Sequence, residues 1–153
     1  MIAYRIADAR LPIFDATGAA RVGGRWNSIG MPVIYACETY AGALLEILVH
    51  ANMDKPPRNH RVVKIVVPES VRIETVSPGQ VPSWSADDQA ASRVFGDTWV
   101  REKRAAVLRV PSVVTGGREY NLVLNPQHPE FGQIKAGKPE PVQWDARLLR
   151  SRS

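Results

Sequence analysis

The stretch GGRWNSIGMPVIYACETYAGALLEILVH, residues 23–50, decides the fold because it predicts a glycine turn, a strand and an apolar helix in immediate succession. The strand covers residues 33–36, and Thr39 is a suitable N-cap for a helix over about residues 40–50. Apolar side chains occupy almost every side of that helix, which is the pattern of a buried helix. Its single acid, Glu46, is therefore predicted to be buried, and a buried carboxylate must be paired or hydrogen-bonded.

Short segments rich in β-branched residues and bounded by turns recur along the rest of the chain. They predict further strands at residues 3–6, 61–67, 71–76, 107–110, 120–124 and about 141–144. A second helix is predicted over about residues 86–103, because Ser85 to Asp88 resembles a capping box. The side chains predicted to face inward from this helix are Ala90, Val94 and Trp99.

The order of these segments predicts the class of fold. Strands and helices do not alternate regularly, as they would in a parallel α/β sheet. We therefore expect one α+β domain over residues 1–153, with a mixed or antiparallel sheet of six or seven short strands and a few helices. Residues 7–22 are expected to form a loop with a turn at Thr17-Gly18, and residues from about 145 to 153 to fray.

Composition excludes several classes of protein. The apolar content of 44% is ordinary for a globular domain, and no apolar run approaches the roughly 18 residues of a membrane span. The N-terminus lacks a basic-then-apolar signal segment, so a cytoplasmic location is expected. The single cysteine, Cys37, cannot form an internal disulfide and is predicted to be a small core residue. The net charge of +5 is scattered rather than gathered in a nucleic-acid-binding module.

Three residues of the quoted stretch suggest a binding site, and each has a structural alternative. Arg25, after Gly24, has the form of an anion clamp, although an arginine in a glycine turn is often only solvated. Tyr35 could stack on a planar ligand with its hydroxyl facing water, or be a core tyrosine. Glu46 could stabilise positive charge developing on a sugar ring, or form a buried salt bridge with Arg5 or Arg25.

Other signals are weaker. Ser112 could orient Glu46 or bind substrate, but a serine after a proline is commonly just a turn residue. There is no G-x-G-x-x-G, Walker A, H-E-x-x-H or C-x-x-C motif. The histidines, His50, His60 and His128, are far apart in the sequence, so no metal site is expected.

Taken in order, six segments of this chain resemble the RES domain family, which supplies toxins of bacterial RES–Xre toxin–antitoxin pairs. These segments are YRIA, GGRWN, VIYA, ALLEIL, the Pro111-Ser112 step and NLVLNP. The resemblance implies a fold similar to ADP-ribosyltransferase toxins, with NAD⁺ as a consumed substrate and no cofactor required. It also implies a helix-turn-helix antitoxin of the Xre type that occludes the pocket, with no membrane and no direct nucleic-acid contact.

The resemblance also assigns roles to residues. The family's arginine, glutamate and serine fall on Arg25, Glu46 and Ser112, and the pocket aromatic falls on Tyr35. Arg25 would bind the pyrophosphate of NAD⁺ and Tyr35 would stack on the nicotinamide. Glu46 would bind the ribose hydroxyls and stabilise the cation as nicotinamide leaves. The further NAD⁺-binding candidates are Gly24, Asn27 and Arg5.

These expectations lead to three hypotheses. The first is a toxin that cleaves the nicotinamide–ribose bond of NAD⁺ by hydrolysis or phosphorolysis. The second is an ADP-ribosyltransferase that modifies a host protein; Leu44, where transferases of the family often carry a second acid, mildly favours a small acceptor instead. The third, of another class, is a non-enzymatic nucleic-acid-binding module.

Overall fold

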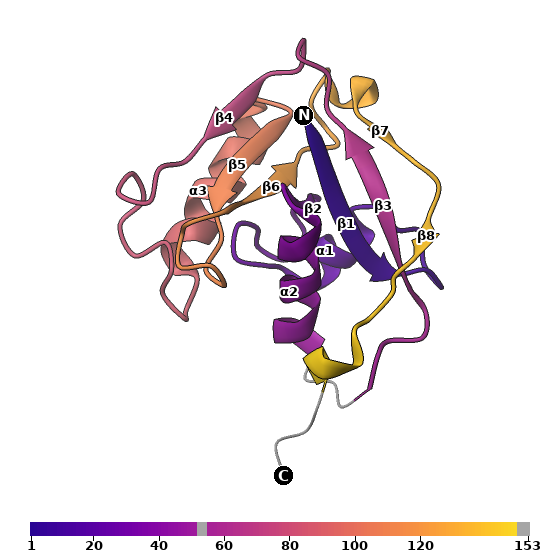
Figure 1. The fold of residues 1–153 in the computed structure, drawn as a ribbon. Coiled ribbons are helices and arrows are strands. Elements are labelled where there is room, and N and C mark those ends of the chain that lie inside the picture. The colour runs from indigo at the N-terminus through magenta and orange to yellow at the C-terminus, as the bar shows by residue number, and fades with distance from the viewer. Residues whose placement is uncertain (52–54, 150–153) are drawn as a thin grey trace.

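The computed structural model describes residues 1–51 and 55–149 (Figure 1). Within them, one sheet of eight strands is surrounded by three α-helices and two short 3-10 helices. The strands are β1 Ile2–Asp8, β2 Ile34–Cys37, β3 His60–Val66, β4 Ile73–Thr75, β5 Val107–Pro111, β6 Tyr120–Leu124, β7 Lys135–Ala136 and β8 Glu140–Pro141. The helices are α1 Thr17–Val22, α2 Tyr40–Ala51, α3 Ala90–Glu102, η1 Phe131–Gln133 and η2 Ala146–Leu149. The predicted single α+β domain is confirmed.

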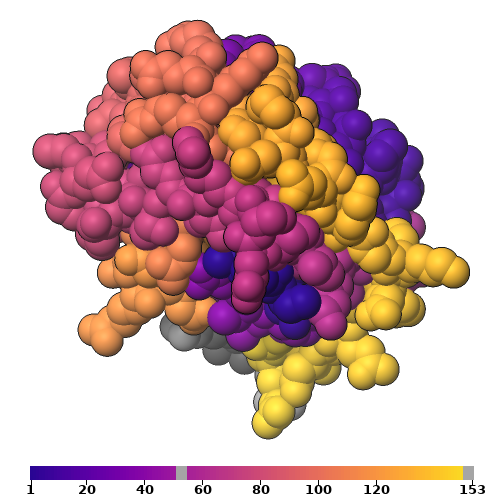
Figure 2. Space-filling model, turned by 90° about the horizontal axis from the view of Figure 1, so that it is seen from above, coloured from indigo at the N-terminus to yellow at the C-terminus, as the bar shows by residue number. Residues whose placement is uncertain are grey.

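The sheet is mixed, as predicted. Its strands run in the order β4-β5-β6-β2-β1-β3-β7, and β8 also pairs with β3. β4 and β5 are parallel, whereas the other pairs are antiparallel. β7 and β8 line the outer edge of β3, and the segment from η1 onward forms a continuous yellow band along one side of the molecule (Figure 2).

Alternating side chains place apolar residues on both faces of the sheet, because successive side chains of a strand point to opposite sides. In β6, Leu122 and Leu124 join a core cluster with Ala3, whereas Val123 joins a second cluster with Trp99 of α3. All five side chains are buried. Each face of the sheet is therefore covered by its own buried apolar cluster.

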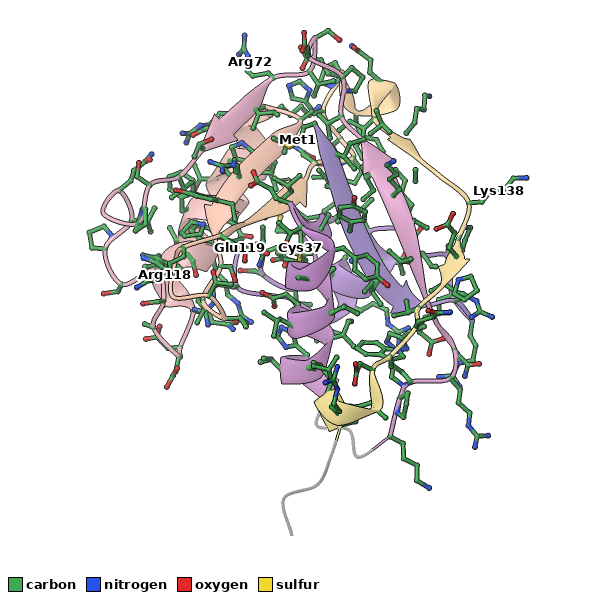
Figure 3. All side chains as sticks on the ribbon, viewed as in Figure 1. Met1, Cys37, Arg72, Arg118, Glu119 and Lys138 are labelled. Atoms are coloured by element: carbon green, nitrogen blue, oxygen red, sulfur yellow. The ribbon has the colours of Figure 1, made fainter. Side chains whose placement is uncertain are left out.

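The start of α2 is fixed by a side-chain cap. The Thr39 hydroxyl accepts a hydrogen bond from the Gly42 backbone N–H at 2.9 Å, which confirms the predicted N-cap. The same hydroxyl donates to Glu119 at 2.8 Å. Figure 3 shows Glu119 and Cys37 beside this end of the helix, where β2 leads into α2. The Thr39 side chain therefore fixes where α2 begins and also holds that end of the helix against Glu119.

Two helices differ from prediction. Residues 17–22 form α1 rather than a loop, because its carbonyl groups are satisfied by partners outside the helix: Asn27 donates to Ala19 at 2.9 Å and Gly30 to Ala20 at 2.7 Å. α3 begins at Ala90 instead of residue 86.

The later start of α3 has a local cause. The backbone of Gln89 is left-handed (φ 59°), so the helix cannot run through it. The Asp88 carboxylate of the predicted capping box accepts the Ala90 N–H at 3.0 Å and so caps the first residue of α3. The predicted inward face of α3 was also wrong in part: Trp99 is fully buried, but Val94 is 67% exposed and Ala90 is exposed.

Smaller differences affect the sheet edges. The strand predicted at 71–76 is only Ile73–Thr75, and the one predicted at 141–144 is reduced to β8. Of the tail predicted to fray, Ala146–Leu149 form η2, while residues 150–153 lie outside the described part of the chain. In the described residues, no helix is long and apolar enough to cross a membrane.

Candidate active site

A cavity of about 620 Å³ opens where α2, the end of α1, residues 23–26 and the start of α3 meet the strands β1, β2 and β6. Small-molecule sites typically enclose about 300–1,000 Å³, so this cavity is large enough for such a ligand. Most residues predicted for the site line it: Arg5, Gly24, Arg25, Tyr35 and Glu46. The other two predicted residues, Asn27 and Ser112, are buried behind its wall.

Glu46 projects from the middle of α2 and is held by three side chains. Its Oε1 accepts hydrogen bonds from Asn121 Nδ2 at 3.0 Å and from Ser112 Oγ at 3.3 Å. Its Oε2 lies 3.3 Å from Nε2 of His50, one helical turn further on. Because a carboxylate oxygen accepts about two hydrogen bonds, Oε1 is fully occupied, whereas Oε2 has only His50 beside it among residues 1–51 and 55–149 and keeps a free lone pair there. No salt bridge joins Glu46 to Arg5 or Arg25, which was the structural alternative.

The surroundings of Glu46 are less buried than predicted. Its side chain is 21% exposed, and on the same helix Leu45 is 40% and Val49 58% exposed. α2 packs only one side against β1 and β2 through Ala43 and its neighbours. The apolar residues on its other side therefore face solvent and the cavity, which corrects the expectation of a helix buried all round.

Ser112 lies immediately after β5 and is 3% exposed. Its backbone is fixed on both sides, since its N–H donates to the Glu119 carbonyl at 2.9 Å and its carbonyl accepts the Gly117 N–H at 2.7 Å. With the backbone held, its hydroxyl reaches Glu46. The geometry thus fits a serine that orients Glu46 rather than a serine in a free turn.

Arg25 follows the Gly23-Gly24 turn and lines the same cavity as Glu46. Its Nη1 donates to the carbonyl groups of Trp84 at 3.1 Å and Ala86 at 2.8 Å. This anchor leaves Nε and Nη2 without a hydrogen-bond partner among residues 1–51 and 55–149. Gly24 is required at its position, because a Cβ there would lie 2.7 Å from the Tyr35 hydroxyl.

The Tyr35 hydroxyl does not face water, which corrects the predicted orientation. It donates to Asn27 Oδ1 at 2.6 Å and accepts the Trp26 backbone N–H at 3.0 Å. Burial raises the pKa of this hydroxyl well above its usual range. The ring still lines the cavity, so Tyr35 combines the two interpretations: its hydroxyl fixes the turn and its ring is available to a ligand.

Asn27 is a structural residue, which corrects its prediction as a ligand contact. It is 0% exposed, and its Nδ2 donates to the carbonyl groups of Ala19 at 2.9 Å and Met31 at 3.0 Å. Its Oδ1 accepts from Tyr35, and the buried side chain is not among the residues that line the cavity. Its spacing after the glycines suggested binding, but the side chain turns inward to hold the loop.

Arg5 enters the cavity from β1. Its Nε donates to the Ile13 carbonyl at 2.6 Å and its Nη1 to the Tyr35 carbonyl at 2.8 Å. Burial lowers the pKa of this guanidinium, which nonetheless remains charged at neutral pH. The cavity wall thus contains three guanidiniums, those of Arg5, Arg25 and Arg93, and one carboxylate, that of Glu46, among its described side chains. This excess of positive charge favours the binding of an anionic ligand.

Comparison with known proteins decides the family. Residues 2–145 match the family model described as the RES domain. The chain belongs to the RES domain family. The resemblance seen in the sequence is confirmed, and the RES domain occupies nearly the whole chain.

Relatives of this RES domain protein are named toxins. One from Sphingobium sp. (strain YBL2), a "Prs ADP-ribosylating toxin", is 39% identical, with 96% of each chain covered. A "Toxin Res" from Pseudomonas putida is 35% identical, over 97% of this chain and all of the other. A chain of the solved M. tuberculosis MbcT–MbcA toxin–antitoxin complex has the same fold (TM-score 0.73, 21% identity), with 97% of this chain and 86% of that chain covered.

Three cavity residues of this RES domain were not predicted as ligands of the site. Asn121 lies in the NLVLNP segment, which contributed only to the family resemblance, and His50 ends the quoted stretch without a motif around it. Arg93 lies in α3 and donates from Nε to the Gly24 carbonyl at 2.8 Å. No local signal marks it, because its role depends on how α3 docks. No group of three metal-ligating side chains occurs among the described residues.

α3 docks directly onto the backbone of residues 23–28. A Cβ at Gly96 would lie 1.7 Å from the Trp26 carbonyl oxygen, so only glycine permits this approach. The next residue, Asp97, accepts the Ser28 N–H at 2.9 Å and the Ser28 hydroxyl at 2.6 Å. The turn that carries Arg25 is therefore fixed by α3 on one side and by Tyr35 on the other.

Proposed function

We propose that this RES domain protein is the toxin of a toxin–antitoxin pair and that it cleaves the nicotinamide–ribose bond of NAD⁺. The observation that carries the proposal is one cavity with a doubly hydrogen-bonded carboxylate, Glu46, on one wall and the anchored guanidinium of Arg25 on another. NAD⁺ carries both matching groups, a ribose bearing a cationic leaving group and a pyrophosphate.

The free lone pair of Glu46 Oε2 determines how the carboxylate would act. As the bond between ribose C1′ and the nicotinamide nitrogen breaks, the bonding electrons leave with nicotinamide, which becomes neutral. Positive charge then develops on the ribose, and a fixed carboxylate stabilises that charge more than it stabilises the ground state. Ser112 and Asn121 hold Oε1, so that Oε2 faces the ribose without reorganising during the reaction.

Water attacking C1′ gives ADP-ribose and a proton, and inorganic phosphate gives the corresponding ADP-ribose phosphate. Leu44, two residues before Glu46, packs with the core cluster around Ala43. It offers no group to activate a protein side chain, which supports a small acceptor. The name of the Sphingobium relative supports the alternative, transfer of ADP-ribose to a host protein.

Nicotinamide release from NAD⁺ by the purified protein tests the chemistry. Glu46→Gln is expected to lower kcat by about 100- to 1,000-fold, the usual effect of removing one electrostatic stabiliser. Glu69→Gln, at an exposed site away from the cavity, is the matched control and should have wild-type activity. Undiminished release by Glu46→Gln would rule out the mechanism. A phosphate titration with product masses, and labelled NAD⁺ with lysate protein, would identify the acceptor.

The mouth of the cavity supports a protein partner. Val22, Val49 and Val113 all line the cavity, yet they are 74%, 58% and 39% exposed. Exposed apolar side chains around a concave site are typical of a protein interface. We infer that the antitoxin, expected to be of the helix-turn-helix Xre type, covers this rim. Val49→Asp should weaken its binding in co-purification with the product of the adjacent gene, whereas exposed Val66→Asp on β3 should not.

A further inference from the structure

We propose that Arg93 is a second pyrophosphate-binding residue and that it forms with Arg25 a clamp of two guanidiniums across the Gly23-Gly24 turn. The proposal rests on the proposed function, which supplies the substrate, and it adds a contact from α3. It makes recognition of the two phosphates a property of two segments far apart in the sequence.

The position of the Arg93 guanidinium is the first observation. Its Nε donates to the Gly24 carbonyl at 2.8 Å, and its Nη2 lies 3.6 Å from where a Cβ of Gly23 would be. The guanidinium therefore lies along the backbone of the glycine turn, and Arg93 lines the same cavity as Arg25. Because Gly23 has no side chain, it leaves this guanidinium uncovered towards a ligand that rests on the turn.

The second observation is that both arginines use the same arrangement. Each guanidinium is anchored on backbone carbonyl groups through a single nitrogen, Arg93 through Nε and Arg25 through Nη1. An anchored guanidinium is pre-organised, so less conformational freedom is lost when its remaining N–H groups bind phosphate oxygens. Backbone anchors leave the positive charge uncompensated, unlike a carboxylate partner.

The third observation is the absence of such a partner. Within residues 1–51 and 55–149, neither Arg25 nor Arg93 has a carboxylate within 4.0 Å, whereas Arg104 and Arg109 pair with Glu74 and Glu38. Asp97, the acid near Arg93 on α3, is already engaged by Ser28. Two partly buried cations without a counter-ion in one cavity repel each other, and a ligand with two negative charges relieves that repulsion.

Gly24 relates the two cations to one place in the fold. A Cβ at Gly24 would lie 2.7 Å from the Tyr35 hydroxyl, Arg93 donates to the Gly24 carbonyl, and Arg25 is the next residue of the chain. Both arginines are therefore held at the glycine turn. A pyrophosphate has two adjacent phosphates, and each can meet one guanidinium there. The clamp predicts that the protein prefers dinucleotides over ligands with a single phosphate.

The test compares Arg93→Gln and Arg93→Lys with Arg101→Gln, which makes the same change of charge on an exposed residue of the same helix. Calorimetry with ADP-ribose at fixed salt measures binding without turnover. Nicotinamide release from NAD⁺ gives KM and kcat separately, and thermal unfolding confirms that each variant is folded. Losing hydrogen bonds to a charged group predicts about 10- to 100-fold weaker ADP-ribose binding for Arg93→Gln.

A binding role predicts that Arg93→Gln raises KM with kcat changed less than about threefold, since ground state and transition state lose the same contact. Arg93→Lys should be intermediate, because it keeps the charge but not the fork. Unchanged ADP-ribose affinity, or a fall in kcat with KM unchanged, overturns the proposal. Arg93 would then have only the structural role of holding the Gly24 carbonyl. If the wild type neither binds ADP-ribose nor releases nicotinamide, the proposed function itself fails, which is a separate outcome.

Discussion

Gly96→Ala is the most demanding test of how the site is held. The added Cβ would lie 1.7 Å from the Trp26 carbonyl oxygen, and real contacts of this kind do not fall below 3.0 Å. α3 and the turn must therefore separate by at least 3.0 − 1.7 = 1.3 Å. A shift of that size lengthens the Asp97–Ser28 hydrogen bonds from 2.9 and 2.6 Å to as much as about 4.2 and 3.9 Å, which breaks them.

The magnitude follows from opposing terms. Overpacking destabilises by about 1–3 kcal/mol, and losing the hydrogen bonds to the Asp97 carboxylate adds about 1.5–3 kcal/mol. Replacing glycine by alanine inside a helix restores up to about 1 kcal/mol. We expect the free energy of unfolding to fall by about 1.5–5 kcal/mol. Because the shift also displaces Arg93 and the turn, activity should fall about 100-fold even where the variant remains folded.

Urea unfolding followed by tryptophan fluorescence measures the stability, and nicotinamide release measures the activity. Gly18→Ala is the matched control, because Gly18 is also helical but has no atom within 4 Å of an added Cβ. It should be neutral or stabilising by up to about 1 kcal/mol. If Gly96→Ala were as stable as this control, α3 would not rest on the Trp26 carbonyl and the account of the site would be wrong.

Three further predictions concern the cavity wall. Ser112→Ala should lower kcat about tenfold with little change in KM, because Asn121 still holds Glu46 Oε1; a wild-type kcat would show that the serine does not orient the acid. Tyr35→Phe should lower the free energy of unfolding by about 1–3 kcal/mol in urea titrations, since buried partners of the hydroxyl lose their hydrogen bonds; no change would contradict its structural role. Burial, with a contribution from Glu46, raises the pKa of the Cys37 thiol to about 12, so iodoacetamide at pH 8 should label it slowly in the native protein and rapidly in urea. Because the pKa of the Cys37 thiol is higher in the folded than in the unfolded protein, the contribution of the neutral thiol to stability is present below about pH 9 and is lost as pH rises toward 12. Rapid labelling of the native protein would refute the burial of Cys37.

The sequence predicted the elements whose patterns are local. The strand at Tyr120–Leu124 was placed correctly and the Thr39 cap was found, because alternation and capping depend on near neighbours. α1 was missed because contacts from Asn27 and Gly30, outside the helix, satisfy its carbonyl groups. A pattern within residues 17–22 does not contain that information.

The candidate site divides in the same way. Arg25 and Glu46 both line the cavity, as predicted; the acid among leucines was the more distinctive signal, whereas an arginine in a glycine turn is often only solvated. Asn27 was wrongly expected to contact ligand, since the same residue type suits a loop anchor and a binding group, and only the fold decides between them. Arg93 could not be found, because its contact with Gly24 joins residues 69 positions apart.

The order of strands in the sheet also sets when Glu46 gains its hydrogen-bond partners during synthesis of the chain. β6 lies between β2 and β5, and it supplies Asn121 to an acid that was translated 75 residues earlier. A nascent chain that has not yet extruded Leu124 from the ribosome lacks the strand between β2 and β5, and its Glu46 lacks the hydrogen bond from Asn121. The carboxylate therefore reaches its final setting only after β6 has been made, long after α2 itself.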